Sequence, residues 1–75
     1  MRLVTVFWRD ATQFQGWFSP QDAKEQEIEP VASVGYLIHQ DEKVVILAQT
    51  DSDDGDQLLG IFHIPAECVT QIEDL

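Results

Sequence analysis

The sequence predicts a mainly β protein: a small five-stranded antiparallel barrel or rolled sheet with one short helix. Two observations predict this fold class. Short runs of β-branched, aliphatic and aromatic residues recur along the chain, and polar turn segments separate them. The 75 residues allow one domain, 1–75. A domain of this size buries only about 60% of the surface that its unfolded chain exposes, so its core is small.

Five apolar runs predict five strands. The first, RLVTVFWR, has neither a helix cap nor a 3.6-residue period. Two later runs are joined only by Gln40, Asp41 and Glu42, which predicts an antiparallel hairpin. The predicted strands cover residues 2–9, 31–39, 43–49, 58–64 and 68–72.

A short helix is predicted over residues 20–26. Ser19 suits the N-cap, Pro20 suits the first helical position, and Asp22 favours the positive end of the helix dipole. Pro30 follows and ends the helix. Residues 65–67, which begin with proline, predict a single helical turn before the last strand.

The predicted strands are apolar on both faces. In the first strand Val4, Val6 and Trp8 share one face, whereas Leu3 and Phe7 share the other. The second and third strands repeat this two-sided pattern. A barrel of this size has a single interior, so its second apolar face needs a helix, a loop or another subunit to cover it. We therefore expect a homo-oligomer, a dimer at the least.

The charge of the chain excludes two classes of partner. Fourteen Asp and Glu residues face four Lys and Arg residues, which gives a net charge of −10. The cations Arg2, Arg9, Lys24 and Lys43 are scattered, whereas nucleic-acid and anionic-membrane binding both need clustered cations. The acidic charge suits a basic partner surface, or it serves only to keep a small domain in solution.

The sequence offers no membrane or export signal. No apolar run reaches the length of about eighteen residues that a membrane span needs, and Met1 and Arg2 lead into a strand pattern instead of a signal peptide. A single cysteine excludes an internal disulfide. We expect a cytosolic protein.

No motif predicts an enzyme, a cofactor or a metal site. The acidic loop at residues 51–56 fails the calcium-loop pattern, because its glycine falls at the fifth position instead of the sixth. There is no glycine-rich phosphate loop and no dinucleotide fingerprint. The residues able to ligate zinc or act as a nucleophile lie on different strands and lack a framing motif: His39, His63 and Cys68. Cys68 is expected in the core.

Aromatic and acidic residues are the candidate binding residues. Five of the seven aromatic residues lie between Phe7 and Phe18, and those in or beside the following loop fit either the core or a protein contact. The second loop contributes carboxylates. The candidates are therefore Trp17, Phe18, Phe14, Asp53, Asp54 and Asp56.

Several short motifs resemble a group of small bacteriophage-encoded proteins of uncharacterised activity. These motifs are the Trp-x-Asp-Ala start at Trp8, Gly16-Trp17, the Ser-Val-Gly-aromatic strand at Ser33, Leu47-Ala48-Gln49 and Ile64-Pro65. The resemblance implies a bacteriophage protein that acts in the host bacterial cytoplasm. It implies no particular activity.

The end of the chain is similar to the close of a Src-homology-3-like barrel. There a glycine, an apolar residue and a proline precede a helical turn and a final Val-x-x-Ile strand, as Gly60, Pro65, Val69 and Ile72 do here. This similarity implies the fold only, because the aromatic motifs of a proline-rich-peptide groove are not evident.

Three functions follow from the resemblance and the charge. The leading hypothesis is an accessory protein that inhibits host or anti-phage defence machinery by stoichiometric binding to a basic protein surface. The second is an oligomeric sponge that sequesters a nucleotide immune signal, with Arg2, Arg9 or Lys43 from several subunits gathered beside stacking aromatic residues. The third is a small virion or assembly protein.

Overall fold

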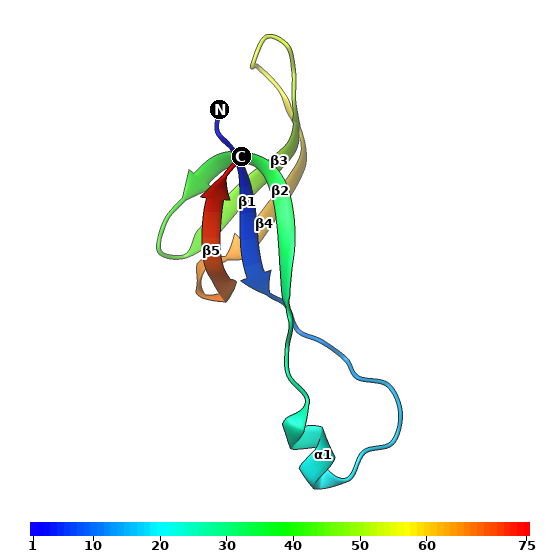
Figure 1. Ribbon diagram of the computed structural model, residues 1–75. Helices are drawn as coiled ribbons and strands as arrows, with labels where there is room; N and C mark the ends of the chain where they lie inside the picture. The colour runs from blue at the N-terminus through cyan, green and yellow to red at the C-terminus, as the bar shows by residue number, and fades with distance from the viewer.

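A computed structural model describes residues 1–75 as one five-stranded antiparallel sheet with a short helix outside it (Figure 1). The strand order is β4-β3-β2-β1-β5. The elements are β1 (Leu3–Arg9), α1 (Pro20–Glu25), β2 (Pro30–Gln40), β3 (Val44–Asp51), β4 (Leu58–Pro65), η1 (Ala66–Cys68) and β5 (Val69–Asp74). No helix has the length and apolar character needed to cross a membrane.

The predicted elements are confirmed, with small shifts in their bounds. The largest shifts are two residues, at the ends of β3 and β5, and Cys68 lies in the 3₁₀ turn η1 and not in the last strand. Pro65 ends β4 and precedes η1, because proline fixes φ and has no N–H to donate to a further ladder bond. The mainly β class with one short helix is therefore confirmed.

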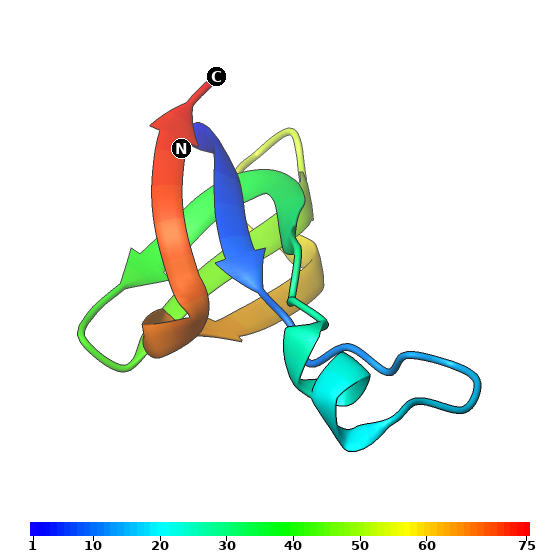
Figure 2. The same cartoon turned by 60° about the horizontal axis from the view of Figure 1, so that its bottom comes forward.

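The sheet is rolled but not closed. Strands β4 and β5 are its two edges and do not pair with each other. Pro65 and η1 turn the chain sharply, so β5 runs across β4 instead of alongside it (Figure 2). The rolled sheet, and not a closed barrel, describes this chain.

The core forms where the sheet folds over itself. Val4 and Val6 of β1 pack against Val45, Leu47 and Ile64 of β3 and β4, although β1 pairs with neither strand. All five side chains are buried. The sheet can roll because the ladders β1–β5 and β2–β3 each contain a register shift, and such shifts increase bend and twist.

The outer face of the sheet is also apolar, as the sequence indicated. Val34, Leu59 and Ile61 are 59%, 69% and 50% exposed. They lie on β2 and β4, on the face opposite to the core. One copy of the chain contains nothing that covers them, so the homo-oligomer stays a prediction.

The connection between β1 and β2 is an arm that projects from the sheet (Figures 1 and 2). We call residues 10–29 the arm. It contributes to an elongated outline of 55 × 23 × 21 Å. Every residue of the arm is exposed, so the arm adds nothing to the core.

Removal of a core side chain tests this description of the core. Ile64 is completely buried, so Ile64→Ala should lower the free energy of unfolding by about 2–5 kcal/mol. A domain of this size has about 3–5 kcal/mol in total, so the variant should be largely unfolded. Urea titration followed by tryptophan fluorescence measures the loss. Leu59→Ala, on the same strand but exposed, should cost less than about 0.5 kcal/mol, and equal losses in the two variants would contradict the assignment.

Candidate functional site

The arm leaves and rejoins the sheet at one point, where Arg9 of β1 pairs with Pro30 of β2. Its one regular element is α1, which begins as the sequence predicts. The Ser19 hydroxyl oxygen accepts a hydrogen bond from the Asp22 backbone N–H at 3.1 Å, and Pro20 is the first helical residue. The helix ends at Glu25, one residue earlier than predicted.

A glycine shapes the arm just before its exposed tryptophan. Gly16 has a φ of +107°, a conformation that other residues adopt only with strain. A Cβ atom at this position would meet no neighbouring atom. The requirement for glycine is therefore conformational, and it fixes the direction in which the chain continues into Trp17.

The three candidate aromatic residues of the arm all lie on the surface. Trp17 is 103% exposed, so its indole ring packs against nothing in the chain. Phe14 and Phe18 are each 42% exposed, and Ile28 on the same arm is 40% exposed. For these residues the structure decides between core and surface, which the sequence left open. Exposed aromatic rings of this kind supply most of the binding energy in protein interfaces.

The arm is also strongly acidic. It carries five carboxylates against the single cation Lys24, a net charge of −4. None of these carboxylates takes part in an ion pair, since the pairs in the chain are Arg2–Asp74 and His39–Asp41. No sequence motif marks these acids as a site, although four of them fall within residues 22–29. They are Asp10, Asp22, Glu25, Glu27 and Glu29.

The acidic loop between β3 and β4 lies at the other end of the molecule from the arm (Figure 1). Its three candidate carboxylates, Asp53, Asp54 and Asp56, are exposed. The long dimension of the molecule is 55 Å, so the structure does not bring the loop carboxylates together with the arm aromatics. The candidate residues form two separate surfaces.

Ser52 organises this loop. Its hydroxyl donates to Asp54 Oδ1 at 2.7 Å and accepts from the backbone N–H groups of Asp56 and Gln57 at 3.2 and 3.0 Å. The hydrogen bond from Ser52, followed by that from the Asp56 N–H, lowers the pKa of the Asp54 carboxyl below its ordinary value. Asp54 is thus engaged in holding its own loop.

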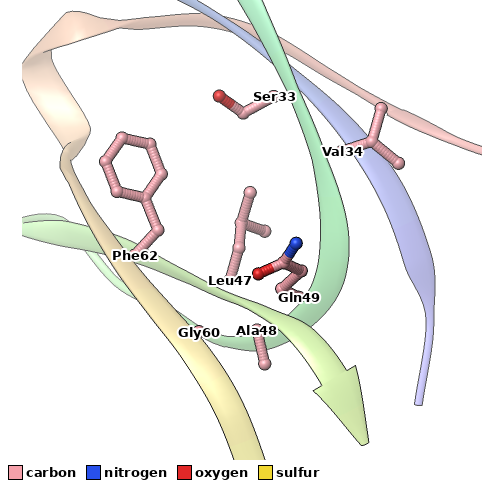
Figure 3. Close-up of a pocket in the computed structure, with 7 residues that line it drawn as sticks. All are labelled: Ser33, Val34, Leu47, Ala48, Gln49, Gly60 and Phe62. Atoms are coloured by element: carbon pink, nitrogen blue, oxygen red, sulfur yellow. The ribbon is translucent and has the colours of Figure 1, made fainter.

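An open groove of about 300 Å³ lies on the inner side of the sheet (Figure 3). The side chains of Ser33, Leu47 and Phe62 face it, while the side chains of Val34 and Ala48 point away. The remaining lining residues are Gln49 and Gly60, so no charged group lines the groove.

Trp8 supports one wall of the groove. Its indole N–H donates to the Ser33 hydroxyl at 3.0 Å, and its ring meets the Phe62 ring edge-on at 5.6 Å between centroids. The hydrogen bond and the ring contact therefore both hold Trp8 inside the fold.

The cations that a nucleotide site would need lie apart in the single chain. Arg2 and Arg9 lie at opposite ends of β1, and Arg2 is paired with Asp74 at 2.8 Å. Lys43 lies in a second hollow whose other lining residues are Glu42 and Glu67. No cavity of the chain therefore presents an excess of positive charge.

The remaining reactive groups are dispersed. His39 Nε2 is 2.7 Å from Asp41 Oδ2 at a hairpin turn, and His63 is exposed on β4. Cys68, which the sequence predicted in the core, is partly buried and packs against the buried cluster from outside. No three His, Cys, Asp or Glu side chains gather as metal ligands would.

Comparison with known proteins does not assign this chain to a family. No protein-family model, curated protein or solved structure matches it. Its function is therefore inferred from the arm, the loop and the sheet themselves.

The pKa of Asp54 gives a direct test of the loop geometry. The carboxyl carbon of Asp54, followed by NMR during acid titration, should titrate below its ordinary pKa, and Ser52→Ala should raise the midpoint towards that value. Because the folded-state pKa is lowered, the hydrogen bonds stabilise the fold above the unfolded-state pKa and are lost as the pH falls through the folded-state pKa. An unchanged midpoint in Ser52→Ala would show that the hydroxyl does not hold the carboxylate.

Proposed function

We propose that this protein acts by stoichiometric binding to another protein and that the arm is its contact surface. The observation that carries the proposal is Trp17, a fully exposed indole on a segment that contributes nothing to the core. An aromatic side chain without a packing role in its own chain is a natural anchor for a partner.

The energy available from this anchor is large. Burial of about 200 Å² of indole surface corresponds to at most about 5 kcal/mol at 25 cal/mol per Å². The neighbouring Phe14 and Phe18 add apolar area on the same arm. The helix α1 holds Ser19 and Pro20 in place next to Phe18, which lowers the entropy cost of ordering this part of the arm on binding.

The chemistry of the partner follows from the charge around the anchor. The arm that carries Trp17 has a net charge of −4, and its five carboxylates take part in no ion pair. They favour a basic surface with an apolar hollow for the indole, because opposite charge speeds the encounter and discriminates against acidic surfaces.

The resemblance to bacteriophage proteins gives this partner a context. We propose that it is a host or anti-phage defence protein in the bacterial cytoplasm, which the arm inhibits by occupying a basic surface. In this proposal the sheet is a Src-homology-3-like scaffold, supported by the strand order and by the turn η1 between β4 and β5. The nucleotide sponge gains no such support, because no cavity of the single chain presents an excess of positive charge.

Substitution of the anchor tests the proposal. Partners captured from bacterial lysate on the tagged whole chain are identified by mass spectrometry, and their affinity is then measured with purified protein. Trp17→Ala should weaken binding by about 30-fold or more, which corresponds to about 2 kcal/mol. Its melting temperature should equal that of the wild type, because Trp17 has no packing partner.

Two further variants define what the result means. Leu59→Ala removes a comparably exposed side chain from the sheet and should bind normally. Replacement of residues 10–29 by a short glycine-containing turn should abolish binding and preserve the fold. A partner that binds the armless protein with unchanged affinity would refute the proposal.

Charge reversal separates the two acidic surfaces. Glu25→Lys with Glu27→Lys on the arm should slow association at least about tenfold at low ionic strength and remove most of its salt dependence. Asp53→Lys with Asp56→Lys in the distant loop makes the same change in net charge and should have a much smaller effect. Association rates measured by stopped flow over a salt series give the comparison. A larger effect from the loop pair would move the contact to the loop.

A further inference from the structure

Strand β4 is an edge strand that is apolar on both faces. Its outer edge pairs with no other strand of the chain. Leu59 and Ile61 on the outer face are 69% and 50% exposed, and Phe62 on the inner face is 41% exposed. Residues 58–66 contain no Asp or Glu, although the whole chain has fourteen such residues. An uncharged edge of this kind is a template for another strand.

The two edges of the sheet differ in charge. Strand β5, the other edge, carries Glu73 and Asp74, and Glu67 precedes it in η1. Two copies with a net charge of −10 repel each other, and contact through β5 would bring the carboxylates of Glu73 and Asp74 of both copies into one interface. Contact through β4 brings together the only edge that carries no acids.

The backbone of β4 limits the register of such a contact. Gly60 has a φ of +73° and departs from extended geometry, while Pro65 has no N–H to donate. Between them Ile61–Ile64 form a regular segment. If two copies pair in antiparallel fashion about a two-fold axis at Phe62, Phe62 meets its own copy and Ile61 meets His63 of the second copy. No like charges are opposed in this register.

We infer that the protein forms a two-fold dimer in which β4 pairs with β4 of a second copy. The dimer contains one continuous sheet through both chains, and the outer-face residues Val34, Leu59 and Ile61 form an apolar surface that continues across the axis. This dimer is a homo-oligomer, as the sequence predicts, but pairing at the strand edge extends the apolar outer face and does not cover it. The interface does not involve the arm, which projects from the C-terminal end of β1 and the N-terminal end of β2 (Figure 1).

Sedimentation of the whole chain with a matched pair of variants tests the dimer. The wild type should sediment as two chains at micromolar concentration. Ile61→Lys places a charge at the paired edge and should give a monomer. Val34 is 59% exposed on the same outer face, but it lies on the interior strand β2. Val34→Lys adds the same charge away from the paired edge, so this variant should remain a dimer. Trp17→Ala should also remain a dimer, which separates this test from that of the proposed function.

Four results would overturn the inference. They are a monomeric wild type at high micromolar concentration, a species larger than two chains, a dimeric Ile61→Lys variant, and dissociation of Val34→Lys. The second result would indicate pairing of β4 with β5, and the fourth would indicate packing between outer faces. Hydrogen exchange of the wild type gives a measurement that needs no variant. Amides within residues 61–64 should become more protected as the protein concentration rises, and protection independent of concentration would also overturn the inference.

Discussion

The packing of β1 across β3 and β4 is the contact on which the remaining structure depends. Val4 and Val6 reach Val45, Leu47 and Ile64 only because the sheet rolls through its register shifts. These five side chains form the buried cluster of a 75-residue chain. A core this small leaves little stability in reserve, so other parts of the chain can be varied only where they do not disturb it.

The arm meets that condition, which is why it can be specialised for contact. It begins and ends at the paired residues Arg9 and Pro30, so the arm is a single insertion in the hairpin of β1 and β2. Loop closure costs grow slowly with length, and a long exposed insertion is therefore tolerated. Because the arm does not pack against the core, Trp17 and its aromatic neighbours are exposed to solvent and available for burial by a partner.

Acidic residues and exposed apolar residues lie on different parts of the molecule. The carboxylates lie on the arm, at the β2–β3 turn, on the β3–β4 loop and near β5, where they favour basic partners and repel other copies. Of the two edge strands, β4 is the one without acids, and its exposed residues are mostly aliphatic or aromatic. The partner contact proposed for the arm and the pairing proposed for β4 therefore use different parts of the molecule.

The sequence by itself determined the local elements. The alternation that separates Val4 and Val6 from Leu3 and the Ser19-Pro20 start of α1 both act through the geometry of neighbouring residues. The bounds of the strands and helices were therefore predicted to within one or two residues. Three features were decided only by the tertiary structure: the open sheet, the exposure of Trp17, and the separation of Asp53 from the arm aromatics. The open sheet depends on the turn at Pro65 and η1, whereas the other two features depend on where the β1–β2 and β3–β4 connections lie relative to the sheet. Local composition carries no record of those distances.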